Sequence, residues 1–298
     1  MKELNIADIL ENTVEFSEKK VWYIAIIGRP NTGKSTFINA LIGEKISITT
    51  NIPQTTRNKI LAIYNDDDSQ LIFFDTPGIH KSNKSFNEEI NSQATSVFAD
   101  ADMILYFIDS AREWGAEEEY IRELLEPVKK PIIKVYTKTD LRPKITIPSS
   151  EHVFRIASPD KIGFPELLEK IKSDLPIRMT EFGEDVYTKQ NMNFRISEII
   201  REKVFAHTKE EIPHATYVWV DEISDEPNML RVVAYVYAES DSQKYVLIWK
   251  AGKLITLIGK EARIELEEIF EKKVFLALRV KVKKNWRKDE KFIKNLLG

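Results

Sequence analysis

Cysteine is absent from this 298-residue sequence, which excludes disulfide bonds, zinc–thiolate centres and cysteine nucleophiles. Any metal ion must therefore be held by oxygen or histidine ligands. Glycine and proline are scarce, with 10 and 12 residues, and 43% of the chain is hydrophobic against 31% charged. This composition is typical of a globular protein and excludes a fibrous or largely disordered chain.

Long apolar runs are missing as well. The longest, Val21–Ile27, is far too short to cross a bilayer. Charged residues interrupt the first twenty positions, where a secretory signal would be apolar. Because cysteine is also absent, we expect a cytoplasmic protein.

The net charge of −3 hides an uneven distribution along the chain. From Lys244 to Gly298, 15 lysines and arginines stand against 7 acidic residues, a net charge of +8, which leaves −11 for residues 1–243. A basic C-terminal segment attracts polyanions, such as RNA or an anionic membrane surface.

The first half of the chain alternates short apolar runs with helix-like stretches, which predicts a doubly wound α/β domain. Two of the runs are separated by only a few polar residues and predict an antiparallel hairpin, Lys59–Tyr64 with Leu71–Phe74. The other predicted strands are Val21–Ile27, Met103–Ile108, Ile132–Tyr136 and Val153–Ile156, and the predicted helices include Phe86–Phe98 and Ala116–Glu126.

The pattern changes after Leu175-Pro176 and Phe182-Gly183, where we place a linker. The remainder predicts a small α+β module with the order helix, strand, strand, long helical stretch and strand. These elements are Asn191–Phe205, Ala215–Val220, Leu230–Ala238, Gln243–Phe270 and Val274–Val282. The long stretch has room for two helices joined at a turn.

Residues 28–35 read Gly-Arg-Pro-Asn-Thr-Gly-Lys-Ser and fit the phosphate-binding pattern G-x-x-x-x-G-K-[ST]. The segment lies between a predicted buried strand and a predicted helix, the context that this motif requires. Gly28 and Gly33 let backbone N–H groups curl around phosphates at the helix N-terminus. Lys34 is expected to reach the outer phosphates, and the Ser35 hydroxyl can ligate magnesium.

Two further motifs follow predicted strands. Asp75-Thr76-Pro77-Gly78 puts an acid at the carboxyl edge of the sheet, where it can hold magnesium through water while Gly78 approaches the γ-phosphate. Thr137-Lys138-Thr139-Asp140 places a carboxylate where it can accept both N1–H and N2–H of guanine, a pairing that adenine does not offer. The three motifs together predict a GTPase and disfavour an ATPase.

From Val21 to nearly its end, the sequence resembles the bacterial Era family of GTPases. The resemblance implies a Ras-like P-loop GTPase domain at 21–178 and an RNA-binding KH domain of the second topological type at 191–298. An N-terminal extension at 1–20 and a linker at 179–190 complete this division. The resemblance also places the first switch at Pro53–Arg57, with Thr56 as the expected ligand of magnesium and γ-phosphate and Thr55 as the alternative. Further expected nucleotide contacts are Thr32, Thr36, Ala157 and Ser158.

The sequence departs from the family pattern at several positions. Thr137 replaces the usual asparagine of the guanine motif, although Lys138 and Asp140 remain. Ile79 stands where Ras-like enzymes have the glutamine that orients water, so we expect slow intrinsic hydrolysis. In related GTPases with an apolar residue there, the asparagine equivalent to Asn31 helps hold a potassium ion. Asn31 therefore suggests K⁺ as a further cofactor, or else it only shapes the loop.

His80 follows Ile79 and has two interpretations. It is either a catalytic base or a solvated switch residue.

The basic segment resembles the KH part of the family, in which a G-x-x-G loop joins two helices and lets the RNA backbone approach. Here the loop is Trp249-Lys250-Ala251-Gly252, so a tryptophan replaces the first glycine. The indole either stacks on an RNA base or packs into the core of the module. Lys250 and Lys253 supply charge for a phosphate.

By resemblance, the chain is a magnesium-dependent switch that binds GTP and GDP and hydrolyses GTP. Its RNA partner would be the 3′ end of small-subunit ribosomal RNA, in assembly of the small ribosomal subunit. A different hypothesis is a GTP-gated adaptor that binds a protein or an anionic membrane surface through its basic segment. Peripheral contact with the inner face of the membrane is compatible with both, and the sequence leaves the oligomeric state open.

Overall fold

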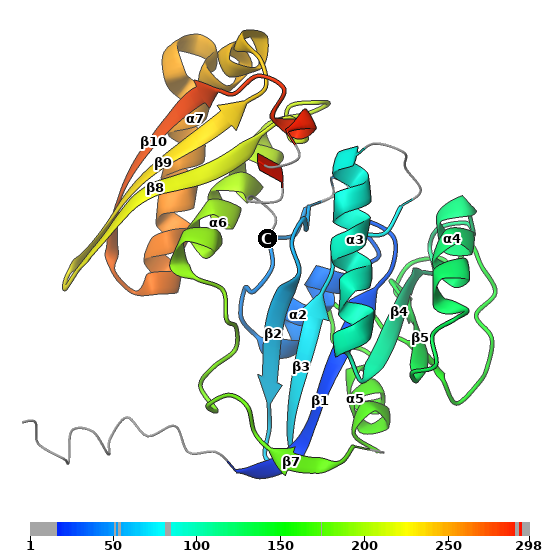
Figure 1. The fold of residues 1–298 in the computed structure, drawn as a ribbon. Helices are drawn as coiled ribbons and strands as arrows, with labels where there is room; N and C mark the ends of the chain where they lie inside the picture. The colour runs from blue at the N-terminus through cyan, green and yellow to red at the C-terminus, as the bar shows by residue number, and fades with distance from the viewer. Residues whose placement is uncertain are drawn as a thin grey trace, which may run out of the picture.

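The computed structural model describes residues 17–50, 52, 55–80, 85–173, 175–289 and 292–293. These residues form two separate β-sheets, one of seven strands and one of three, each with its own helices (Figure 1). Most of the expected N-terminal extension lies outside the described residues, and β1 (Glu18–Ile27) already begins at Glu18. The described part of the chain has no helix that is both long enough and apolar enough to span a bilayer.

The larger sheet has the strand order β2-β3-β1-β4-β5-β6, with β7 beside the first residues of β1. Its strands are β2 (Ile60–Asn65), β3 (Ser69–Asp75), β4 (Met103–Asp109), β5 (Ile132–Thr137), β6 (Val153–Arg155) and β7 (Ile177–Met179). β2 and β3 form the predicted antiparallel hairpin, whereas β3, β1, β4, β5 and β6 run parallel. The doubly wound α/β prediction is confirmed.

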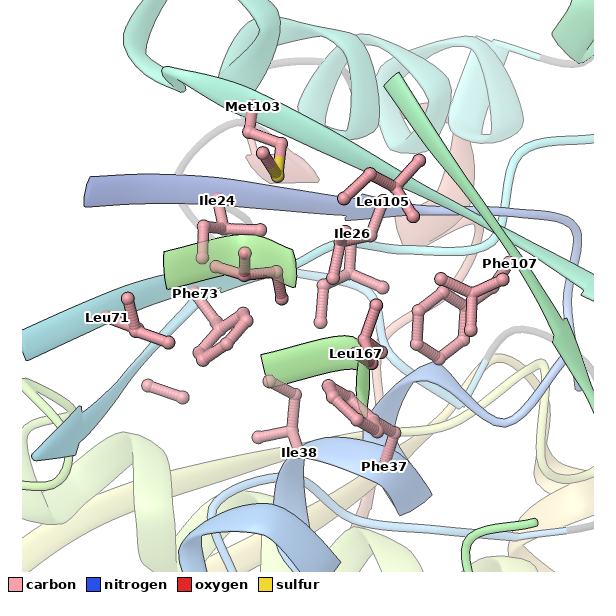
Figure 2. Packing of buried hydrophobic residues seen from close by; sticks show 14 of the residues in the cluster. Ile24, Ile26, Phe37, Ile38, Leu71, Phe73, Met103, Leu105, Phe107 and Leu167 are labelled. Carbon is pink, nitrogen blue, oxygen red and sulfur yellow. The ribbon is translucent and has the colours of Figure 1, made fainter. Parts of the chain in front are cut away.

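Strand β1 is buried on both faces because its side chains alternate between two cores. Ile24 and Ile26 face α2 (Lys34–Ile42) and α5 (Phe164–Lys172), as Figure 2 shows for the residues around Phe37 and Leu167. Ala25 and Ile27 join the opposite core. That core is covered by α3 (Ser85–Asp100) and α4 (Ala116–Leu125).

The predicted linker between the two sheets is hydrogen-bonded to the larger one. Ile63 N donates a hydrogen bond to the Tyr187 carbonyl at 2.9 Å, and Thr188 Oγ1 donates to the Leu61 carbonyl at 2.9 Å. These bonds tie the linker along β2, the outer strand of the sheet, whose backbone groups would otherwise lack partners. The short strand β7 at the start of the linker was not predicted, because three exposed residues carry no apolar alternation.

The smaller sheet has the order β10-β9-β8, from β8 (Tyr217–Glu226), β9 (Met229–Ala238) and β10 (Lys273–Val282). β8 and β9 are antiparallel, and β10 joins β9 in parallel after a helical crossover. Helices α6 (Met192–His207) and α7 (Asp241–Phe270) supply Ile196, Ile200, Leu247 and Ile258 to the core against β9. The predicted order of helix, two strands, helical stretch and strand is therefore confirmed.

The long helical stretch differs in detail from its prediction. The structure has one helical range, α7, in place of two helices separated by a turn. Within it, Gly252 has a φ of +91°, a left-handed conformation that a regular α-helix does not contain. Gly252 therefore marks the joint, which lies inside the helical range. A short 3₁₀ helix, η1 (Trp286–Lys288), follows β10 and was not predicted.

Candidate nucleotide site and its junction with the smaller sheet

The phosphate-binding segment runs from the end of β1 to the start of α2, as the motif requires. A Cβ atom at Gly28 would lie 2.5 Å from the carbonyl oxygen of Phe107 on β4, so only glycine lets the loop pass. Gly33 has a φ of +89°, which glycine adopts without strain. Both predicted glycines are thus required by the backbone.

Lys34 is buried in this loop. Its Nζ donates to the carbonyl oxygens of Arg29 at 3.1 Å and Gly28 at 3.3 Å. Burial lowers the pKa of Lys34 to about 8, and the nearby Asp75 carboxylate opposes part of that shift. A bound phosphate would give this ammonium group a negatively charged hydrogen-bond acceptor in addition to these carbonyls.

Three oxygen-bearing side chains gather beside Lys34. The hydroxyls of Ser35 and Thr56 lie 3.0 Å apart. Asp75 is fully buried, and neither of its carboxylate oxygens has a hydrogen-bond partner among the described residues. Burial raises the pKa of Asp75, which Ser35 and Lys34 partly counteract. An orphaned carboxylate beside two hydroxyls is an oxygen donor set that fits Mg²⁺.

The two candidate threonines of the first switch occupy different positions. Thr55 Oγ1 donates to the carbonyl of Ile52 at 2.7 Å and lies 2.6 Å from Thr50 Oγ1. Only Thr56 reaches Ser35. The geometry therefore favours Thr56 over Thr55. Pro53 and Gln54 of the expected switch lie outside the described residues.

The segment Gly78–His80, which follows β3, begins packed against the phosphate loop. Ile79 N donates to the Gly28 carbonyl at 3.0 Å, and a Cβ at Gly78 would lie 2.5 Å from Pro30 N. His80 is 9% exposed, and its Nδ1 is 3.3 Å from the Gly78 carbonyl. The interpretation of His80 as a solvated residue is therefore wrong, because the chain turns its ring back against its own backbone.

Thr137 explains how this chain manages without the usual asparagine. Its Oγ1 donates to the carbonyl of Thr32 at 2.7 Å and so ties the guanine motif to the phosphate loop. Lys138 pairs with Asp109 at 2.7 Å, whereas the Asp140 side chain is exposed. An exposed carboxylate at this edge is available to a base.

Ala157 and Ser158, two of the expected nucleotide contacts, follow β6 and differ in their backbone hydrogen bonds. Ala157 N already donates to the Ile162 carbonyl at 3.1 Å. The N–H of Ser158 has no acceptor among the described residues, which makes it the better candidate donor to guanine O6. The remaining expected contacts, Asn31 and Thr36, lie at the phosphate loop and line its cavity. Asn31 has a φ of +63°, so its backbone conformation is part of the loop's shape.

The residues that join the nucleotide site to the smaller sheet were not predicted from the sequence. Arg57 is 4% exposed and donates to the carbonyls of Thr216 at 3.0 Å and Pro213 at 3.2 Å. Its guanidinium lies 5.9 Å from the ring centre of Trp286. Burial, and then the charge of Arg201, lower the pKa of Arg57 to about 9. No sequence signal distinguishes such an arginine from a solvated one.

Further contacts hold the first switch and the segment before it. Arg201 of α6 donates to the Thr55 carbonyl, and Glu202 Oε1 accepts from Thr49 N at 3.0 Å. Lys45 pairs with both Glu202 and Glu265. Burial would raise the pKa of Glu265, but hydrogen bonds from Lys203 and Lys45 outweigh it and lower the pKa below its ordinary value.

The expected RNA-binding loop lies at the bend of α7. Trp249 is 57% exposed and Tyr245, one turn earlier, is 74% exposed. The alternative in which Trp249 packs into the core is therefore wrong. Lys253 is exposed, and the side chains of Lys250 and Ala251 lie outside what the structure describes.

Two family models match the chain. Residues 23–138 match a model described as 50S ribosome-binding GTPase, and residues 211–287 match the KH domain. The two matches fall on the larger and the smaller sheet respectively.

Similar proteins cover nearly the whole chain. It is 41% identical to GTPase Era of Borrelia garinii subsp. bavariensis over 289 residues, which are 94% of this chain and 100% of the relative. Identity to GTPase Era of Treponema denticola is 41% over 288 residues, covering 92% of this chain and 98% of the relative.

Solved structures of similar proteins share both domains. One is Era in complex with MgGDPNP and nucleotides 1506–1542 of 16S ribosomal RNA, with a TM-score of 0.87 and 32% identity over 93% of this chain and 98% of that chain. Another is a variant of Aquifex aeolicus Era bound to GDP and AlF₄⁻, with a TM-score of 0.86, 32% identity and the same coverage.

Proposed function

Because the chain belongs to the Era family of GTPases, we propose that it is a magnesium-dependent GTPase that binds the 3′ end of small-subunit ribosomal RNA during assembly of the small ribosomal subunit. The observation that carries the GTPase part is the buried, unpartnered Asp75 beside the hydroxyls of Ser35 and Thr56. A free carboxylate at this depth is costly without a cation.

The residue roles in the nucleotide site follow from this geometry and are part of the proposal. Ser35, Thr56 and Asp75 would hold Mg²⁺, which neutralises phosphate charge when bound. Lys34 and the backbone N–H groups of residues 31–36 would hold the phosphates, with Gly78 next to the γ-phosphate. Asp140 and Ser158 N would recognise guanine, while Thr137 and Lys138 position the loop.

Hydrolysis by this site is expected to be slow without help. Ile79 is fully buried and apolar, so it can neither orient a water molecule nor donate to one. We propose K⁺ bound near Asn31 as the additional charge that compensates for the missing glutamine. The relative with GDP and AlF₄⁻ supports hydrolysis as the family reaction.

RNA binding is assigned to the bend of α7 and its neighbours, Trp249, Lys250, Ala251, Gly252 and Lys253. The exposed indole offers a flat surface for a base, and the left-handed Gly252 keeps one glycine of the usual loop. The relative solved with nucleotides 1506–1542 of 16S ribosomal RNA supports this RNA as the partner. We place the domain limits at 21–178 and 191–298, with 179–190 as the linker.

Communication between the two domains would pass through the first switch. Thr56 faces Ser35, while its neighbours Thr55 and Arg57 are held by groups of the KH domain. A change of Thr56 on nucleotide exchange would therefore alter contacts made by α6 and by the segment before β8.

The experiment compares how full-length protein binds two different polyanions. Filter binding uses a single-stranded RNA of the 16S 3′-end sequence, and flotation uses phosphatidylglycerol vesicles, each with GDPNP or GDP and magnesium. Saturable RNA binding that depends on the nucleotide, without vesicle binding, is the expected result. Vesicle binding without RNA binding at low salt would instead favour the adaptor with peripheral membrane contact, and would overturn the RNA proposal.

A further inference from the structure

A second pocket lies away from the phosphate loop, beneath α4 and against β4 and β5. Its volume is about 450 Å³, within the range of small-molecule sites. Apolar surface comes from the rings of Tyr106 and Trp114 and from Leu125 and Ile132, and the charged lining residues are Arg122, Glu123, Glu126 and Lys134. None of these residues belongs to the nucleotide or RNA sites described above.

One polar atom at this pocket has no partner. Tyr106 is 2% exposed, and its hydroxyl makes no hydrogen bond to any group within the described residues. Burial raises the pKa of this hydroxyl, so it remains protonated at neutral pH. Buried polar groups are normally hydrogen-bonded, and an exception calls for a specific cause. A ligand that offers a polar atom to Tyr106 would supply that partner.

The charges around the pocket are unequal. Arg122 is already paired with Glu119 at 2.6 Å, and the Trp114 indole donates to the same carboxylate. The side chains of Glu123, Glu126 and Lys134 form no ion pair with any described residue. With the Arg122–Glu119 pair set aside, two carboxylates face one ammonium group, so these three lining side chains together carry a net charge of −1.

We propose that this pocket binds a small alkylamine that carries an aromatic ring. The flat ring packs against the indole of Trp114 and the apolar wall of Leu125 and Ile132. The protonated amine lies near Glu123 and Glu126, and the Tyr106 hydroxyl accepts a hydrogen bond from an N–H of the ligand.

The pocket is linked to the phosphate loop through α4. Glu118, in the first turn of this helix, pairs with Arg29 of the loop, with Oε1 2.7 Å from Nε and Oε2 3.0 Å from Nη1. Both partners are almost fully buried, and the Arg29 carbonyl accepts from Lys34 Nζ at 3.1 Å. A ligand that shifts α4 therefore also shifts a partner of the phosphate-binding lysine. This link rests on the proposed nucleotide site, whereas the pocket itself does not.

The test uses phenethylamine as the probe and 3-phenylpropionate, which has a similar ring and tether but the opposite charge, as its control. The ¹H–¹⁵N indole signal of Trp114, assigned with Trp114→Phe, is followed in full-length protein. We expect a saturable shift with phenethylamine at millimolar concentration and a weaker response to the acid. Tyr106→Phe should weaken binding about threefold to tenfold, because it removes only the hydroxyl. Tyr120→Phe, on α4 but outside the lining, should leave binding unchanged.

The outcomes separate the pocket from its link to the nucleotide site. The pocket proposal is overturned if phenethylamine causes no saturable shift, or if Tyr106→Phe binds it as tightly as the parent protein. The release rate of fluorescent GDP is then measured with and without phenethylamine. A change that disappears in Tyr106→Phe supports the link, and an unchanged rate in protein saturated with phenethylamine overturns the link alone. Failure to bind GDP at all would refute the proposed function without affecting the pocket.

Discussion

Arg201 of α6 donates a hydrogen bond to the backbone carbonyl of Thr55, one residue before the threonine that faces Ser35. On the other side of that threonine, Arg57 donates to the carbonyl of Thr216 at 3.0 Å. Of these three consecutive residues, Thr56 contacts the phosphate loop, while Thr55 and Arg57 contact α6 and the segment before β8. Thr56 cannot move far without disturbing at least one of these two arginine contacts.

This arrangement predicts that Arg201 transmits the nucleotide state. Coupling between two sites typically amounts to about 1–3 kcal/mol. In Arg201→Ala, the ratio of RNA affinities with GDPNP and with GDP should fall toward one, because Thr55 is released from α6. Arg195→Ala serves as the control. Arg195 lies on the same helix as Arg201, but it donates a hydrogen bond to the Tyr187 hydroxyl instead. RNA titrations with each nucleotide measure the ratio, and an unchanged ratio in Arg201→Ala would contradict the prediction.

Asp140 should determine the choice of base. Its exposed carboxylate can accept two N–H groups from guanine, whereas an amide accepts one and donates to the C2 oxygen of xanthine. Asp140→Asn is therefore expected to weaken GTP binding and to improve binding of xanthosine triphosphate. Competition titrations with the two triphosphates provide the measurement. Unchanged nucleotide preference in this variant would refute the assignment.

Nucleotide affinity should depend on pH through Lys34. Its pKa in the free protein is about 8, lower than the ordinary value of 10.5, because it is buried. A bound phosphate favours the charged form, so above about pH 8 binding must take up a proton. The dissociation constant for GDP is then expected to rise by up to about tenfold per pH unit.

Calorimetry in buffers of different ionisation enthalpy measures this proton uptake directly. Lys34→Ala should bind GDP more weakly, by about 1.5–3 kcal/mol, and should lose the pH dependence in this range. The same lysine gives the free protein a stability that increases between about pH 8 and 10.5, because the unfolded chain holds the proton more tightly. Proton uptake that persists in Lys34→Ala would show that another group is responsible.

Hydrolysis should be faster in potassium than in sodium at equal ionic strength. The expected difference arises because Ile79 cannot orient water and a cation near Asn31 would offset phosphate charge. Asn31 has a φ of +63°, so Asn31→Ala would add backbone strain to the loss of the side chain. Asn31→Gly keeps the conformation and is the cleaner variant. Single-turnover rates that are indifferent to the cation in the parent protein would rule out this role.

Trp249 should contribute to RNA binding and little to stability. Because its side chain is 57% exposed, Trp249→Ala is expected to cost less than about 1 kcal/mol, against about 3 kcal/mol or more for a core tryptophan. RNA affinity should fall by about 1–3 kcal/mol for a lost stack, with an unchanged salt slope. Lys253→Ala should instead lower that slope by about 0.7. Thermal melts and RNA titrations at several salt concentrations separate the two effects.

The fold of both domains could largely be predicted from local pattern. The unbroken run Val21–Ile27 is the central strand, and its alternate residues enter two cores as expected of a strand covered on both sides. Strand β8 runs to Glu226, beyond the predicted Val220, because the end of the hairpin extends into solvent and its charged residues show no apolar alternation. β7 and η1 were not predicted for a different reason, because three-residue elements are too short to show a pattern.

The phosphate loop was determined by the sequence alone, because its glycines, lysine and serine act within one strand-loop-helix segment. Only the tertiary structure shows what depends on long-range packing: the position of Thr56 beside Ser35, the burial of His80 and the contact of Arg57 with the segment before β8. Arg57 and Thr216 are 159 residues apart in the chain. The sequence around an arginine such as Arg57 predicts a solvated side chain. Only the packing of the second domain against the first removes this guanidinium from water.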